Sequence, residues 1–201
     1  MSAAEPKRHL LVFSRVPIPG RVKTRLIPTL GEAGATAVYR RLLRDTLESC
    51  ARVREVRREL WLDQTTSDPE LNETASRLGL SLHLQHGADL GARMQHAFVD
   101  VFERARSAVL IGSDCPEYDR DYIEAAFQAL ERHDAVLGPA ADGGYVLIGL
   151  KRVEARLFND KPWGTADVLE TCLLYTSPSP RDCRPARGCR LLVENGGGGG
   201  G

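Results

Sequence analysis

The sequence lacks both a long hydrophobic run and an excess of either charge. Lys plus Arg and Asp plus Glu each number 27, so the formal net charge is zero. Non-specific nucleic-acid binding depends on many basic side chains that face phosphates, and this balance argues against it. No apolar run approaches the roughly 18 residues that a membrane span needs, and Leu10–Phe13 is too short for a signal peptide. We therefore expect a soluble cytoplasmic protein with neither a nucleic-acid nor a membrane partner.

Cysteine is scarce, and several motifs of familiar chemistry are missing. Only Cys50 and Cys115 precede residue 172, and they match neither a disulfide framework nor a metal-ligand spacing. The histidines lack the HExxH spacing of a zinc site, and no Cys–His signature supports Cys115 as a nucleophile. The phosphate-binding loop GxxxxGK[ST] and the dinucleotide fingerprint GxGxxG are absent as well.

Residues 172–201 differ in composition from the rest of the chain. They hold three of the five Cys and seven of the nineteen Gly, and they end in six consecutive Gly. One interpretation is a flexible linker. The run 172–182 can also be back-translated into a transposase-type sequencing adapter. We predict that residues 172–201 are non-native, adapter-derived and disordered, and that residues 1–171 form one domain truncated at its C-terminal end.

Short apolar runs alternate with amphipathic segments through residues 1–171. The pattern predicts strands over 9–14, 59–63, 80–84, 108–112, 135–138 and 145–148, and helices over 31–53, 67–79, 90–105 and 119–133. Strands separated by helices favour right-handed crossovers. We therefore predict an α/β, Rossmann-like fold with a mainly parallel sheet and helices on both faces. Ligands of such sheets bind at the carboxyl ends of the strands.

A basic loop follows the first predicted strand. Pro17 and Pro19 stiffen it, and Gly20 lets the backbone approach a ligand closely. Arg makes bidentate contacts to phosphate oxygens, and Lys supplies a compact charge. The pattern predicts a diphosphate site, with a solvated basic loop as the alternative. The residues expected to bind nucleotide and diphosphate are Arg15, Gly20, Lys23 and Arg25 of this loop, together with Arg93 of a later segment.

Two carboxylates occur beside later strands. Asp114 follows the strand 108–112, where a single carboxylate can hold Mg²⁺ or Mn²⁺ against a diphosphate; a capping or turn Asp is the alternative. Asp142 precedes Gly143, Gly144 and Tyr145 at the start of another strand. This segment is either a hairpin turn or a close approach to the substrate, with Asp142 as an acceptor, a second metal ligand or a base.

Two further segments complete the candidate site. In 87–94, Asp89 is expected to cap a helix, and Arg93 faces either a phosphate or solvent. In 162–165, Trp163 either lines an acceptor pocket or packs in the core. We assign Gly143, Gly144, Tyr145 and Trp163 to the acceptor pocket.

Five motifs occur in a fixed order along the chain. They are Arg-x-Pro-x-Pro-Gly-x-x-Lys-Thr-Arg-Leu, Asp-Leu-Gly-x-Arg-Met, Gly-Ser-Asp-Cys-Pro, Asp-Gly-Gly-Tyr-x-Leu-Ile-Gly and Pro-Trp-Gly-Thr. Together, over residues 10–170, they resemble bacterial GT-A-like nucleotide-diphospho-sugar transferases of the arsenosugar-biosynthesis and radical-SAM/selenodomain-associated type. The resemblance implies a GT-A fold, nucleotide binding by loop 15–25, and Asp114 in the place of a metal-binding Asp-x-Asp motif that is reduced here to Ser113-Asp114-Cys115.

The expected reaction is glycosyl transfer from a nucleotide sugar to a small-molecule acceptor. Basic side chains and Mg²⁺ or Mn²⁺ would neutralise the departing nucleoside diphosphate, and Asp142 would act as the base on the acceptor hydroxyl. One alternative is nucleotidyl transfer from an NTP to a phosphorylated acceptor. Another is non-catalytic nucleotide-sugar binding. The sequence leaves the sugar, the base, the acceptor and the oligomeric state open.

Overall fold

The chain folds around one mixed sheet. The computed structural model describes residues 7–113, 119–139, 145–158 and 192–194. The strands are β1 (Arg8–Ser14), β2 (Val56–Leu62), β3 (Leu80–Leu84), β4 (Ser107–Gly112), β5 (Ala135–Pro139), β6 (Tyr145–Leu150) and β7 (Leu192–Glu194). The helices are α1 (Ile27–Ala51), α2 (Pro69–Leu78), α3 (Leu90–Phe102) and α4 (Arg120–Arg132), with 3₁₀ turns η1 (Thr24–Leu26) and η2 (Ala155–Leu157).

The strand order confirms the predicted fold class. The sheet runs β3-β2-β1-β4-β6-β5-β7. β1 to β4 pair in parallel, and β6 pairs antiparallel with both β4 and β5. The parallel strands follow the α/β alternation read from the sequence, and their carboxyl ends therefore lie along one edge of the sheet. The segment that joins β5 to β6 lies outside the described residues.

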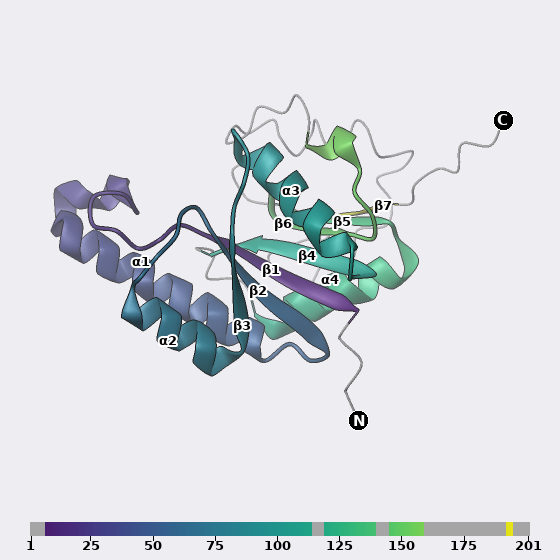
Figure 1. The fold of residues 1–201 in the computed structure, drawn as a ribbon, viewed down its shortest axis with the longest axis horizontal. Coiled ribbons are helices and arrows are strands. Elements are labelled where there is room, and N and C mark those ends of the chain that lie inside the picture. The colour runs from purple at the N-terminus through teal and green to yellow at the C-terminus, as the bar shows by residue number, and fades with distance from the viewer. Residues whose placement is uncertain (1–6, 114–118, 140–144, 159–191, 195–201) are drawn as a thin grey trace.

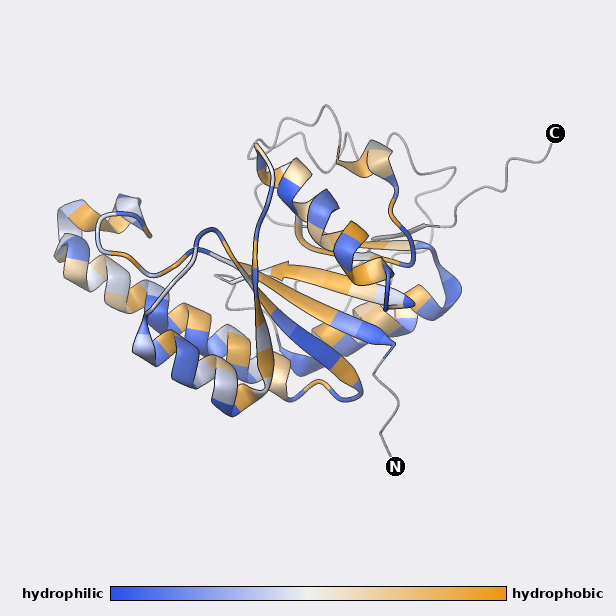
Figure 2. Cartoon of the chain, viewed as in Figure 1, coloured by the Kyte–Doolittle hydropathy of each residue, from blue (hydrophilic) through white to orange (hydrophobic). Residues whose placement is uncertain are grey.

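Helices cover both faces of the sheet, as predicted (Figure 1). Leu10 and Val12 of β1 pack into a core with apolar residues of α1, α2 and α4. Leu11 and Phe13 point to the opposite face and pack against α3 and η2. Alternate residues of a strand point to opposite faces, so a central strand buried on both sides reads as a continuous apolar run. In Figure 2, β4 and much of β1 are orange, whereas the helices alternate between orange and blue residues.

Local chemistry accounts for the ends of α2. Asp68 caps the helix by accepting a hydrogen bond from the Leu71 N–H, and Pro69 occupies the first turn. Gly79 ends the helix with a φ of 66°, in the left-handed region. The helix predicted over 67–79 is therefore confirmed together with the signals that limit it.

α1 begins earlier than the sequence pattern suggested. The prediction starts at Gly31, whereas the helical segment starts at Ile27 and is interrupted by non-helical angles at Gly31. Gly31 has a φ of 70°, which suits a residue without a side chain. The kink at Gly31 therefore separates a first turn, which carries Pro28, from the regular helix. No helix within the described residues is long and apolar enough to cross a membrane.

Segment 172–201 departs from its predicted disorder at three residues. Leu192–Glu194 form β7, which pairs antiparallel with Ala135–Leu137 of β5. An edge strand offers unpaired N–H and C=O groups that a short segment with Leu and Val can satisfy. The prediction of disorder therefore does not hold for β7. The remainder of 172–201 lies outside the described residues.

Candidate functional site

A cleft of about 560 Å³ opens at the carboxyl ends of the parallel strands. Each of the four strands contributes a wall residue at or just after its last position: Ser14, Asp63, Gln85 and Gly112. Phe13, Val22 and Leu90 add apolar surface. The cleft therefore lies where α/β sheets bind ligands.

Three basic side chains from two separate segments line this cleft. Arg15 follows β1, Lys23 precedes η1, and Arg93 lies in the first turn of α3. Arg15 and Arg93 are held by backbone carbonyls: Arg15 Nη1 donates to the Arg21 oxygen at 3.3 Å, and Arg93 Nε donates to the Gly87 oxygen at 3.1 Å. Three of the five residues predicted to bind a diphosphate thus share one cleft.

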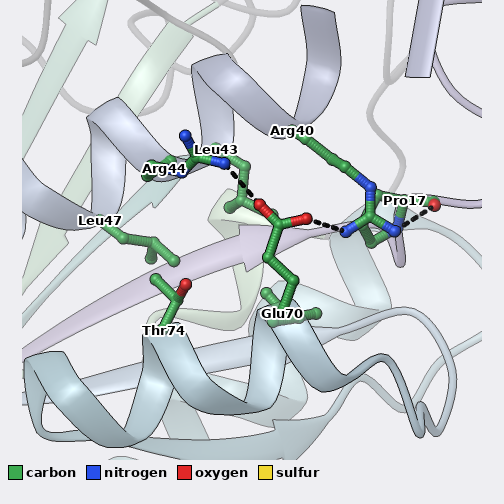
Figure 3. A pocket seen from close by; sticks show the side chains of 8 residues that line it. Pro17, Arg40, Leu43, Arg44, Leu47, Glu70 and Thr74 are labelled. Atoms are coloured by element: carbon green, nitrogen blue, oxygen red, sulfur yellow. Dashed lines mark hydrogen bonds and ion pairs between the residues drawn. The ribbon is translucent and has the colours of Figure 1, made fainter. Parts of the chain in front are cut away.

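Three side chains hold the backbone of the basic loop at consecutive residues. The Arg15 N–H donates to Tyr39 Oη at 3.0 Å, and the Val16 N–H donates to Asp63 Oδ1 at 2.8 Å. The Pro17 carbonyl accepts from Arg40 Nη2 at 3.5 Å (Figure 3). These contacts come from α1 and from the end of β2, so the loop is positioned before any ligand arrives.

Arg40 also belongs to an ion-pair cluster between α1 and α2 (Figure 3). It pairs with Asp68 and Glu70, and Arg44 pairs with the other oxygen of Glu70. The hydrogen bond from Arg40 outweighs burial and lowers the pKa of Asp68, and the same bond raises the pKa of Arg40. The cavity beside this cluster holds about 20 Å³, room for one water. We therefore assign it a structural role.

Buried hydroxyls form another part of the cleft lining. Tyr39 Oη lies 2.9 Å from both Ser14 Oγ and Ser113 Oγ. The Ser113 carbonyl accepts from Thr46 Oγ1 at 3.3 Å. Tyr39, Ser14, Ser113 and Thr46 each expose 5% of their surface or less. α1 thereby joins the loop after β1 to the turn after β4.

Two predicted nucleotide-binding residues do not line the cleft. Arg25 lies in η1 and is exposed. Gly20 has a φ of 78°, and a Cβ there would lie 3.3 Å from a Glu32 carboxylate oxygen. The turn itself therefore requires Gly20. Asp89 caps α3 as predicted, since it accepts from the Ala92 N–H at 2.8 Å.

Tyr145 stands at the start of β6 and is not among the residues that line the cleft. Its hydroxyl lies 3.9 Å from Met94 Sδ of α3. The other predicted catalytic, metal and acceptor residues lie outside the described residues: Asp114, Asp142, Gly143, Gly144 and Trp163. Within the described part of the chain, no three His, Cys, Asp or Glu side chains are grouped as metal ligands.

Sequence reasoning missed three residues of the cleft. Tyr39 lies on the apolar face of α1 and reads as a core residue, because its hydroxyl contacts are distant in sequence. Asp63 and Gln85 follow β2 and β3 directly, so the rule that strand ends carry ligands would have found them. Gln85 Nε2 donates to the carbonyls of Trp61 at 2.8 Å and Ser14 at 3.2 Å.

Comparison with known proteins assigns the family. The family described as "Uncharacterized protein conserved in bacteria" (DUF2064) matches residues 46–165. This chain belongs to DUF2064. The matched range includes the strand ends that carry Asp63, Gln85 and Ser113, whereas the basic loop and Tyr39 precede it.

Solved structures support the same fold for this DUF2064 member. It is 33% identical to a "putative nucleotide-diphospho-sugar transferase" from Desulfovibrio desulfuricans G20, with a TM-score of 0.76 over 84% of this chain and 74% of that one. 4-Diphosphocytidyl-2C-methyl-D-erythritol synthase from Anaerococcus prevotii DSM 20548 is 9% identical, with a TM-score of 0.54 over 87% of this chain and 86% of that one. The second likeness shows the fold alone. No curated protein matches the chain. The arsenosugar and radical-SAM association stays a prediction.

Proposed function

We propose that this DUF2064 protein is a transferase that binds the diphosphate of a nucleotide sugar in the cleft and transfers the sugar to a small-molecule acceptor. The observation that carries the proposal is the convergence of Arg15, Lys23 and Arg93 at the carboxyl ends of β1 to β4. The 33% identity to the Desulfovibrio protein supports a nucleotide-sugar donor.

The basic side chains suit a departing nucleoside diphosphate. Negative charge grows on the diphosphate as the sugar leaves, and fixed cations near that charge lower the barrier. Arg15 presents a planar guanidinium and Lys23 a compact ammonium group. Because the loop backbone is held at Arg15, Val16 and Pro17, little reorganisation is needed when the charge develops.

A divalent cation is part of the proposal. Asp114 follows the cleft residue Ser113 directly in sequence, and Mg²⁺ or Mn²⁺ accepts one or two carboxylates together with phosphate oxygens. When bound, the cation would supply further charge for the diphosphate. The acceptor is proposed to meet Asp142 as a base, next to Gly143, Gly144, Tyr145 and Trp163. These assignments rest on the motifs.

The test is to identify the products. The protein is incubated with single nucleotide sugars, with and without Mn²⁺, and the release of nucleoside diphosphate is followed with candidate acceptors. Calorimetry with the same nucleotides gives the affinity. Release of nucleoside diphosphate supports the proposal, whereas pyrophosphate formed from an NTP would replace it with nucleotidyl transfer. Binding without turnover against a broad acceptor panel favours a binding protein, and absence of both would contradict the proposal.

A further inference from the structure

The Tyr39 hydroxyl is the centre of a hydrogen-bond network that connects two segments that line the cleft. It lies 3.0 Å from the Arg15 nitrogen, 2.9 Å from Ser14 Oγ and 2.9 Å from Ser113 Oγ. Arg15 and Ser113 come from the ends of adjacent parallel strands, β1 and β4. A single atom of α1 therefore contacts both segments that face the cleft.

The protons of this network can be assigned in more than one way, because the Tyr39 hydroxyl can donate to Ser14, to Ser113 or to the Arg15 carbonyl at 3.3 Å. A tyrosine hydroxyl has one proton and two acceptor sites, and the Arg15 N–H uses one acceptor site. In the first arrangement, Ser14 donates to the Arg15 carbonyl at 2.9 Å, Tyr39 donates to Ser14, and Ser113 donates to Tyr39. In the second, Ser14 donates to Tyr39 and Tyr39 donates to Ser113. The second arrangement leaves the Ser113 proton for another acceptor.

We propose that Tyr39 is a positioning residue that turns the Ser113 hydroxyl into a donor for a phosphate oxygen in the cleft. Ser113 lines the cleft that also contains Arg15, Lys23 and Arg93. A hydroxyl that accepts one hydrogen bond becomes a stronger donor of its own proton, and buried surroundings strengthen the bond further. The Tyr39 hydroxyl also fixes the Arg15 backbone at the same time, so cation and donor keep a set separation.

This inference rests on the proposed function, because it requires a phosphate group in the cleft. It adds a neutral donor to the three cations, and it assigns a role in binding to Tyr39, which contributes its ring to the core. The class of ligand is an oxyanion with several acceptor oxygens, such as inorganic pyrophosphate or a nucleoside diphosphate. A hydroxyl donor suits such oxygens without adding charge.

The experiment is a double-mutant cycle with pyrophosphate and with nucleoside diphosphates as probes, measured by calorimetry on the full chain. Tyr39→Phe removes only the hydroxyl, and Ser113→Ala removes the donor. Each single variant is expected to bind roughly ten- to hundredfold more weakly, the effect of one lost hydrogen bond to a charged group. The double variant is expected to bind about as weakly as the weaker single variant, because both changes act on the same bond.

A matched control separates positioning from stability. Thr36 is a buried residue of α1 whose hydroxyl donates to the Glu32 carbonyl at 2.7 Å, within the helix. Thr36→Val should therefore leave pyrophosphate affinity unchanged. An equal loss in Thr36→Val and Tyr39→Phe would overturn the inference, since removing a buried hydroxyl elsewhere in α1 would then be sufficient. Losses that multiply in the double variant would overturn it too, because they indicate independent contributions.

The remaining outcomes distinguish the two proposals. If the unmodified protein binds neither probe, the proposed function and this inference both fail. If the unmodified protein binds a probe and both single variants bind it as tightly as the unmodified protein does, only the inference fails. Should Tyr39→Phe not fold, Ser113→Ala is compared with Thr46→Val, which removes the hydroxyl on the Ser113 carbonyl. Unchanged affinity in Ser113→Ala, or an equal loss in Thr46→Val, would then overturn the inference.

Discussion

His9 Nδ1 lies 2.8 Å from Glu59 Oε1, and neither side chain has exposed surface. The two residues stand on neighbouring strands, β1 and β2, on the face that α3 covers. Glu59 Oε2 accepts from Trp61 Nε1 at 3.0 Å, and Arg104 approaches Oε1 at 3.4 Å. A carboxylate without access to water is retained only when such partners offset its lost hydration. Neither residue lines the cleft, so removing one partner of the pair should affect stability and not ligand binding.

The surroundings of Glu59 and of the nearby His83 predict that the folded protein loses stability in acid. Burial opposes ionisation of Glu59, but the hydrogen bond from His9 and the nearby charges of His83 and Arg104 lower its pKa below the ordinary value. Burial also opposes the charged form of His83, and this lowers its pKa because the charged form is the protonated one. In both cases the unfolded chain binds more protons, so the free energy of unfolding falls as pH drops, first below about 6.5 and again below about 4.5. Urea unfolding at a series of pH values measures this.

Glu59→Gln isolates the contribution of the carboxylate. At pH 7 the variant should be about 3 kcal/mol less stable, since one partner of a buried pair is removed. The difference from the unmodified protein should shrink as pH falls through the pKa of Glu59, because the side chain at this position is then uncharged in both proteins. A difference that stays constant down to pH 3 would contradict the assignment of the charge to Glu59.

Lys23 and Arg25 provide a matched pair in the basic loop. Lys23 lines the cleft, whereas Arg25 is exposed and absent from its lining. Lys23→Ala should weaken nucleoside diphosphate binding roughly ten- to hundredfold, the usual effect of a lost hydrogen bond to a charged group. Arg25→Ala should change affinity less than threefold. Calorimetry on both variants measures the contrast, and a larger loss from Arg25→Ala would move the phosphate site towards η1.

Much of the fold can be predicted from the sequence because local signals and hydrophobic pattern agree. Asp68, Pro69 and Gly79 define α2 by capping, proline placement and a left-handed end. The buried run at Leu10–Phe13 predicts a central strand covered on both faces. Such signals act within a few residues, and a single sequence contains all of them.

The site was less predictable because its contacts join distant segments. Tyr39 and Ser113 are 74 positions apart, and nothing in a helical pattern separates a core tyrosine from one whose hydroxyl reaches a cleft. Lys23 has a φ of 46°, in a region that side chains other than glycine rarely adopt. The 3₁₀ turn that follows Lys23 places Arg25 outside the cleft lining, and no residue type in the loop signals that turn.

The Arg40–Asp68 pair predicts a graded response to substitution. Asp68 caps α2 and pairs with Arg40, which also reaches the Pro17 carbonyl. Asp68→Ala removes the cap and the charge, and should lower the free energy of unfolding by about 1–2 kcal/mol. Asp68→Asn keeps the cap and should cost less than about 1 kcal/mol, because the pair is partly exposed.

The pH dependence of the Asp68 variants provides a second measurement. The hydrogen bond from Arg40 lowers the pKa of Asp68, so its contribution is present above about pH 4 and is lost as pH falls through the folded pKa. Asp68→Asn should therefore lose this part of the acid dependence. If Asp68→Asn and Asp68→Ala were equally destabilising at pH 7, the ion pair with Arg40, and not the helix cap, would be the larger contribution of Asp68 to stability.

Gly138 and Gly149 test how closely the sheet packs near the hairpin of β5 and β6. A Cβ on Gly138 would lie 2.2 Å from Tyr122 Oη and 2.9 Å from Leu147 Cβ, and the second atom is fixed to the neighbouring strand. Gly138→Ala should therefore lower the free energy of unfolding by about 1–3 kcal/mol. A Cβ on Gly149 would meet the flexible end of the Leu130 side chain at 3.0 Å, so Gly149→Ala should cost less. Adding Tyr122→Phe to Gly138→Ala should recover only part of the loss, because Leu147 still obstructs the new methyl group. Urea unfolding of the three variants measures the order, and a Gly138→Ala protein as stable as the parent would show that α4 and β6 can move away from β5 at this point.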